Sequence, residues 1–381
     1  MNMAYLDNSA TTKVCDEAIS AAVEMMNINF GNPSSLHCLG VNAEKQLSLS
    51  KSIIGETLSC ERSNIIFTSG GTESNNIAIF GAVKKKRREG NKIITTSIEH
   101  PSVLNCFKEL EKDFQVVYIK PDKDGKIPVS EFQKEIDENT ILVSCMLVNN
   151  ETGEILPCKF IKDIIKAKSS PALFHIDAVQ GYLKIPFNPT SYGADLVTIS
   201  AHKIHGMKGC GALYIKDKNI ISTTVFGGEQ EQNIRSGTQN MPGIAAFSAA
   251  AKKGYESIRE NFEYIKELRA YLINRLSEIS DIKINSPSDG ANHILNISVM
   301  NLQSEVMLHH LESMNVFVSA GSACSSKNKG KSHVLTSMGL DNERINSALR
   351  ISLCADNDKE DIDMLIDGLK SCRKNLVGRK G

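Results

Sequence analysis

Two residues near the ends of apolar runs could together hold a carbonyl cofactor. Lys203 follows the β-branched run 196–199, which predicts a buried strand, and glycines lie close behind it. A lysine there can hold an aldehyde as a Schiff base. Asp177 closes the apolar run 173–176, where a carboxylate needs a positive partner such as a pyridinium nitrogen. The pair indicates pyridoxal phosphate; a surface lysine and a helix-capping aspartate are the alternatives.

A glycine turn provides a candidate site for the cofactor phosphate. The strand-like run 65–68 leads into Gly70, Gly71 and Thr72, and an apolar helical run follows at 77–83. Backbone N–H groups at such a helix start attract anions. We therefore expect Gly71 and Thr72 to bind the phosphate.

Cys324 and Arg350 are candidates for contact with a substrate. Cys324 lies in a small, polar segment followed by three lysines, which would favour its thiolate. A surface thiol without a function is the alternative. Arg350 interrupts the apolar run 348–353, where a guanidinium needs an anionic partner. A substrate carboxylate could pair with it through two hydrogen bonds, and a structural salt bridge is the competing interpretation.

The composition restricts the class of protein. Lys and Arg together number 44, as do Asp and Glu, and the formal net charge of zero argues against a nucleic-acid or anionic-membrane binder. No apolar run approaches the ~20 residues that span a bilayer. No signal peptide is visible, so we expect a cytoplasmic protein. The ten cysteines and nine histidines show no spacing typical of a metal site.

The runs that must position these residues predict an α/β protein. Strand-like and helical runs alternate from about residue 53 to residue 214, which indicates a large domain around a mainly parallel sheet. Polar residues follow successive strands, among them Asn150 and Gln180, at the edge where such sheets bind ligands. Helical sequence from 245 to 277 precedes further strand runs at 294–299 and 316–318.

Three segments resemble the cofactor-site motifs of a known enzyme group. Segments 177–180 (Asp-Ala-Val-Gln), 200–206 (Ser-Ala-His-Lys-Ile-His-Gly) and 235–238 (Arg-Ser-Gly-Thr) are similar to those of cysteine desulfurases of the NifS/IscS group, within the class-V aminotransferase superfamily. The match runs in order along nearly the whole chain. It implies the fold of type-I pyridoxal-phosphate-dependent transferases, with a mainly parallel seven-stranded sheet in a large domain (15–254). A small α+β domain (1–14 and 255–381) would carry the cysteine loop.

The resemblance also implies roles for individual residues. Lys203 and His100 would be catalytic, with His100 lying over the pyridine ring and assisting proton transfer. The implied cofactor-binding residues are His100, Lys203, Asp177, Gln180, Asn150, Gly71, Thr72, Ser200, His202 and Thr238. Thr238 would reach the cofactor of a second subunit, which implies a homodimer. Arg350 and Asn32 would bind the substrate.

The activity implied by the resemblance is conversion of L-cysteine to L-alanine, with a persulfide formed on Cys324. The segment 319–325 departs from the commonest signature of the group at Ala320 alone. Sulfur would then pass to an acceptor protein for iron–sulfur cluster assembly or for thiolation of tRNA or cofactors. A selenocysteine lyase or aminotransferase on the same fold, or a sulfur-relay scaffold, remains an alternative. The chain ends soon after its last predicted helix, which leaves the acceptor open.

Overall fold

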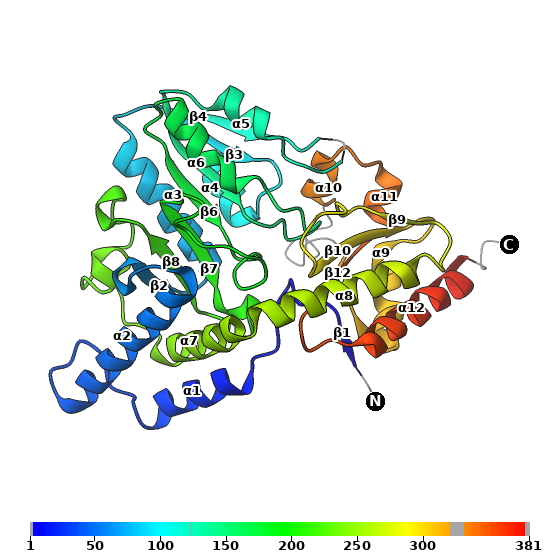
Figure 1. Ribbon diagram of the computed structural model, residues 1–381, viewed down its shortest axis with the longest axis horizontal. Coiled ribbons are helices and arrows are strands. Elements are labelled where there is room, and N and C mark those ends of the chain that lie inside the picture. Colours follow the sequence, from blue (N-terminus) through cyan, green and yellow to red (C-terminus); the bar gives the residue numbers. More distant parts are fainter. Residues whose placement is uncertain (1–2, 123, 321–330, 378–381) are drawn as a thin grey trace.

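Seven apolar strands form one sheet at the centre of the large domain (Figure 1). The computed structural model describes residues 3–122, 124–320 and 331–377. The strand order is β2–β8–β7–β6–β5–β3–β4. Strands β7 through β4 run parallel, whereas β8 is antiparallel to both β2 and β7. The predicted mainly parallel, seven-stranded sheet is confirmed. The strands are β2 (Ile65–Thr68), β3 (Lys92–Thr96), β4 (Gln115–Ile119), β5 (Thr140–Met146), β6 (Leu173–Asp177), β7 (Leu196–Ser200) and β8 (Gly211–Ile215).

Helices cover both faces of this sheet because side chains alternate along each strand. In β2, Ile66 packs toward one helical layer, while Ile65 and Phe67 pack toward the other. The first layer contains α3 (Gly71–Lys86) and α4 (Pro101–Leu110). The second contains α2 (Cys38–Leu58), α6 (Cys158–Ala167) and α7 (Met241–Glu256), with α1 (Asp16–Asn27) packed on α7. Helix α5 (Val129–Glu135) lies beside the edge strand β4.

A second hydrophobic core belongs to the small domain. It combines Ala4 and Leu6 with apolar residues between Leu268 and Cys372, so the first strand of the chain packs with its last third. The strands form an antiparallel sheet of order β12–β10–β9 and a parallel pair β1–β11. The elements are β1 (Ala4–Tyr5), α8 (Ile258–Leu276), β9 (Ile282–Ile284), β10 (Ile294–Val299), α9 (Ser304–Ser313), β11 (Val316–Phe317), β12 (Ala348–Ser352) and α12 (Lys359–Cys372).

The two cores do not divide the sequence at one point. Helix α10 (His333–Ser337) lies within the last third of the chain, yet Val334 and Leu335 belong to the large core. Only Ser257 separates α7 from α8. The domain boundaries at residues 14 and 254 therefore remain a prediction.

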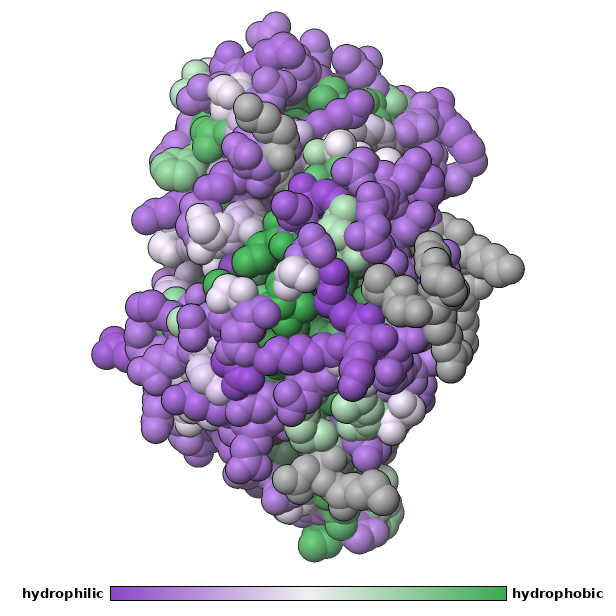
Figure 2. Space-filling view, turned by 90° about the vertical axis from the view of Figure 1, so that its right-hand side faces the viewer, coloured by the Kyte–Doolittle hydropathy of each residue, from purple (hydrophilic) through white to green (hydrophobic). Residues whose placement is uncertain are grey.

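The face presented by the small domain is largely hydrophilic, with hydrophobic residues gathered near its middle (Figure 2). The short helix α11 (Asn342–Asn346) completes the helices named here. None of the helices in the described part of the chain is long and apolar enough to cross a membrane.

Candidate active site

The carboxyl ends of three central strands border a cavity of about 220 Å³. Met146, Asp177 and Ser200, which end β5, β6 and β7, all line it. This is the position at which open parallel sheets bind ligands. Ten of the thirteen residues that the sequence predicts for the site line this cavity: Gly71, Thr72, His100, Asn150, Asp177, Gln180, Ser200, His202, Lys203 and Arg350.

Lys203 is presented by a short 3-10 turn that directly follows β7. Its Nζ donates hydrogen bonds to the backbone carbonyl oxygens of Ser9 and Ala10, at 2.5 and 2.7 Å. These acceptors belong to the N-terminal segment, which therefore crosses to the pocket and holds the lysine side chain in it.

A chain of hydrogen bonds connects Asp177 with His100. The Asp177 carboxylate accepts from Asn75 Nδ2 at 2.8 Å and from the Val179 N–H at 3.0 Å. Asn75 Nδ2 also donates to Ser102 Oγ at 2.8 Å, and Ser102 Oγ lies 2.8 Å from His100 Nδ1. Asp177 is only 5% exposed, so these donors stabilise a carboxylate that burial alone would disfavour.

Both histidines of the pocket have a lowered pKa, which favours their neutral form. Burial lowers the pKa of His100, and the charges of Lys203 and His333 lower it further, whereas Asp177 opposes the shift. Burial, followed by Lys203 and other nearby cationic groups, lowers the pKa of His202 to about 3. His100 Nδ1 accepts a hydrogen bond from the Ser102 N–H at 3.1 Å, so its single proton is on Nε2.

The large-domain wall of the pocket contains buried polar atoms without a partner. Within the described part of the chain, Ser200 Oγ, Gln180 Oε1 and Asn75 Oδ1 have no hydrogen bond. Such atoms are costly in a folded protein unless a ligand satisfies them. Close by, a Cβ on Gly71 would lie 2.9 Å from Val179 Cγ2, so a side chain there would crowd the start of α3. The wall therefore suits a bound polar group.

Arg350 forms the opposite wall and has its own internal partner. It is 2% exposed, its Nη2 lies 2.7 Å from Asp7 Oδ1, and its Nη1 donates to the Asn150 carbonyl at 3.0 Å. Ser319 Oγ in turn donates to Asp7 Oδ2 at 3.3 Å. The Arg350 Nε–H has no partner among the described residues, so part of the guanidinium remains available to a ligand.

Two predicted site residues lie away from this cavity, and a third falls outside the described residues. Asn32 is exposed, and its side chain accepts a hydrogen bond from the Ser34 N–H within its own loop. Thr238 is also exposed and lines a separate cavity of about 60 Å³ together with Arg235. Cys324 lies outside the described residues. The roles expected of these three residues remain predictions.

Sequence reasoning missed several residues that complete the pocket. Asp7 and Ser9 lie in the opening segment, to which the sequence analysis assigned no role. Asn75 and Ser102 follow the glycine turn and His100 in the sequence. The one feature of the sequence that could have indicated Asn75 and Ser102 is their position next to predicted site residues. The contacts between Asp177, Asn75 and Ser102 depend on how α3 and α4 pack.

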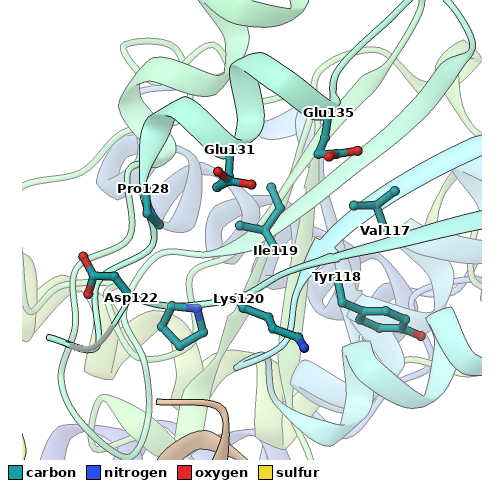
Figure 3. Close-up of a pocket in the computed structure, with 9 residues that line it drawn as sticks. Val117, Tyr118, Ile119, Lys120, Asp122, Pro128, Glu131 and Glu135 are labelled. Atoms are coloured by element: carbon teal, nitrogen blue, oxygen red, sulfur yellow. The ribbon is translucent and has the colours of Figure 1, made fainter. Parts of the chain in front are cut away.

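A larger cavity, of about 350 Å³, lies between the edge strand β4 and helix α5 (Figure 3). Glu131 and Glu135 of α5 lie over this region, near Ile119 of β4 (Figure 3). Glu131 pairs with Lys134 at 3.7 Å, and Glu135 pairs with Lys92 at 3.6 Å. None of the predicted site residues that the structure describes lines this cavity, so its size does not identify it as the active site.

The chain resembles known proteins over almost its whole length. The family model for aminotransferase class-V matches residues 4–365. Cysteine desulfurase IscS of Clostridium botulinum is 38% identical over 370 residues, covering 96% of this chain and 93% of that protein. The IscS of Methanosarcina thermophila is 39% identical over 365 residues, covering 95% and 90%.

Solved structures show the same similarity over almost the whole chain. A NifS-like protein superimposes with a TM-score of 0.92 at 34% identity, covering 98% of this chain and 100% of the other. A protein described as SspA in complex with cysteine gives a TM-score of 0.81 at 30% identity, covering 92% and 98%. Together with the strand-end pocket, these similarities show that the chain belongs to the class-V aminotransferase family.

Proposed function

We propose that this protein is a pyridoxal-phosphate-dependent cysteine desulfurase that converts L-cysteine to L-alanine. The observation that carries the proposal is the convergence of Lys203, Asp177 and Arg350 on one cavity of about 220 Å³. These groups suit an aldehyde, a pyridine nitrogen and a carboxylate, respectively. The relatives named cysteine desulfurase, and the relative solved with cysteine, support this choice of substrate.

The residues of the pocket fit pyridoxal phosphate. Gly71 and Thr72 begin a 16-residue helix whose positive end would hold the phosphate, assisted by Ser200 Oγ and His202. Gln180 Nε2 donates to the Ser9 carbonyl at 3.0 Å and has a second N–H to offer the phenolic oxygen, beside Asn150. Bound there, pyridoxal phosphate would supply an electron-poor ring that accommodates negative charge developing at the substrate Cα.

The side chains of this pocket would then bind the substrate and move its protons. Arg350 would bind the substrate carboxylate, using the N–H groups that Asp7 and Asn150 leave available. The Lys203 amine would remove and return the proton at Cα. Asp177, held by Asn75, would keep a proton on the pyridine nitrogen. His100, neutral with its proton on Nε2, would assist proton transfer.

Cys324 is the proposed sulfur acceptor. Its thiolate would attack the substrate sulfur, so that an S–S bond forms as the Cβ–S bond of cysteine breaks. Protonation of the remaining fragment yields alanine, and the balance is L-cysteine plus Cys324 thiol to L-alanine plus Cys324 persulfide. We propose that an acceptor protein then takes this sulfur from the Cys324 persulfide.

We also propose that the protein acts as a homodimer. Large apolar side chains are exposed along the α1–α2 region, and Leu36 reaches 98% exposure: Ile19, Val23, Met26, Ile28, Phe30, Leu36, Val41 and Leu49. Apolar surface of this extent is typical of a protein–protein interface. Thr238 is exposed outside the pocket of its own chain, where it could serve a partner subunit. Light scattering should give twice the mass of 41.7 kDa, and a monomer would contradict the proposal.

Alanine and sulfide formation from L-cysteine tests the function. With a reductant present, the purified protein should release the two products in equal amounts. Cys324→Ser should retain bound cofactor but form neither persulfide nor sulfide. Retained sulfur transfer by this variant would exclude Cys324 as the acceptor. Bound cofactor without alanine from the unmodified protein would contradict the choice of substrate.

A further inference from the structure

A second cluster of reactive side chains lies between the segment that carries Lys203 and the strand that carries Arg350. His205 follows Lys203, and Cys354 and Asp356 belong to the turn after β12. One ligand atom from each of these three residues lies within 4.8 Å of the other two. His205 and Asp356 face each other, since His205 Nδ1 and Asp356 Oδ2 are 3.7 Å apart.

The histidine side of the cluster is held in place by the N-terminal segment. The His205 N–H donates to Thr12 Oγ1 at 2.7 Å, and its carbonyl accepts from the Cys15 N–H at 3.0 Å. Its Nδ1 lies 3.0 Å from the Lys13 carbonyl oxygen, which can only accept, so Nδ1 carries the proton. The lone pair of Nε2 remains, which is the usual arrangement of a metal-binding imidazole.

The cysteine side is equally constrained. Asn357 closes the turn, since its Oδ1 accepts from the Cys354 N–H at 2.9 Å and its N–H donates to the Cys354 carbonyl at 3.2 Å. Asn357 Nδ2 ties the turn to the Tyr5 carbonyl at 2.9 Å. Cys354 is buried, whereas the Asp356 side chain is 72% exposed and leaves a route from solvent. Ligands held in this way need little rearrangement to bind a metal.

The charges around Cys354 also suit a metal-bound thiolate. Asp356 contributes a negative charge near Cys354, and Lys184 contributes a positive one. Lys184 Nζ is buried and has no hydrogen bond among the described residues. A divalent ion with one thiolate and one carboxylate is neutral, so it would not add net charge beside Lys184.

We propose that His205, Cys354 and Asp356 bind one divalent metal ion of the zinc class, with water as a fourth ligand. A thiol, an imidazole and a carboxylate together are a ligand set typical of Zn²⁺. On binding, the S–H bond of Cys354 breaks, its proton goes to solvent, and a metal–sulfur bond forms. The ion would tie the Lys203 segment to the Arg350 strand and so fix the spacing of the two walls of the pocket.

Cobalt titration of the holoenzyme tests this site, because tetrahedral Co²⁺ reports its ligands by its absorbance. After treatment with a chelator, one Co²⁺ per chain should bind with a thiolate-to-cobalt charge-transfer band, and one equivalent of Zn²⁺ should abolish that band. Asp356→Asn, His205→Asn and Cys354→Ser should each weaken binding by more than about tenfold. Asparagine is chosen at position 205 because the backbone φ is +65° there.

Variants of other cysteines serve as controls that assign the charge-transfer band to Cys354. Cys38→Ser removes an exposed thiol elsewhere and should leave the cobalt spectrum unchanged, as should Cys324→Ser. An unchanged charge-transfer band in Cys354→Ser, or failure of the unmodified protein to bind one equivalent at micromolar Co²⁺, would overturn the proposal. The titration does not require cysteine turnover, so its outcome is independent of the desulfurase activity.

Discussion

The two walls of the active-site pocket differ in how their polar atoms are satisfied. On the large-domain wall, Ser200 Oγ, Gln180 Oε1 and Asn75 Oδ1 are buried without a partner in the described structure. On the small-domain wall, Asp7 already provides Arg350 with a carboxylate at 2.7 Å. The large-domain wall therefore suits a group that stays bound, whereas the small-domain wall already binds a carboxylate of the protein itself.

This difference has a physical reason. A resident cofactor is present throughout the life of the folded enzyme. The protein atoms that bind the cofactor can therefore lack hydrogen-bond partners within the protein, because the cofactor provides them. A substrate comes and goes, and a guanidinium that is 2% exposed would otherwise be a buried, uncompensated charge between turnovers. Asp7 supplies that compensation and should compete with the substrate. Four substitutions, ordered by expected effect, test this contrast.

Lys203→Ala should have the largest effect, because it removes the group proposed to link the cofactor to the large-domain wall. The same amine is expected to move the proton at Cα, so alanine formation should fall by more than about 10³-fold. Initial rates of alanine release measure this. Lys208→Ala, at a nearby exposed lysine, is the control and should keep its activity. Substantial turnover by Lys203→Ala would exclude the assignment.

Arg350→Lys tests the small-domain wall. Lysine keeps the positive charge but loses the planar set of donors that contacts Asp7 and Asn150 and is proposed to bind the substrate carboxylate. Losing charge-assisted hydrogen bonds should raise KM for L-cysteine by about 10–100-fold, with a smaller change in kcat. Arg344→Lys is a suitable control, because Arg344 makes a two-pronged contact with Asn285 away from the pocket. An unchanged KM would show that Arg350 does not bind the carboxylate.

Ser200→Ala tests whether an unpartnered hydroxyl of the large-domain wall binds the cofactor. Its hydroxyl has no partner in the described structure, so the cofactor-free protein should lose no stability. Cofactor affinity should fall by about 3–10-fold, the worth of one hydrogen bond. Ser144→Ala is the matched control, because Ser144 Oγ is buried and bonded to His175 Nδ1 at 2.8 Å. It should lower the free energy of unfolding by about 1 kcal/mol and leave cofactor affinity unchanged.

Asp7→Asn should have the smallest effect of the four substitutions. The direction in which it changes the affinity for L-alanine is the informative result. Asparagine can still accept from Arg350 Nη2 but carries no charge, so it competes less with an incoming carboxylate. L-alanine, which has no sulfur to lose, should bind the holoenzyme about threefold more tightly, as measured by titration of the cofactor absorbance. Weaker binding would instead mean that Asp7 chiefly positions Arg350, and the contrast between the walls would fail.

The sequence by itself determined the large domain and the chemistry of its strand ends. Alternating apolar strands and helices predict a parallel sheet, and parallel strands bring their carboxyl ends to one edge. Asp177 and Ser200 were therefore expected at the same edge of the sheet once their strands were recognised. The family resemblance added the roles of His100, Gln180 and Arg350, and the structure places all of these residues at one cavity.

Only the tertiary structure decided what pairs with the catalytic groups. Asp7 and Arg350 are 343 residues apart, and they meet because the first strand of the chain packs with the small domain built from its last third. The same packing brings His205 beside Cys354 and Asp356. Periodicity and motifs describe neighbours along the chain, whereas these contacts depend on how two separately cored domains dock, which no local pattern encodes.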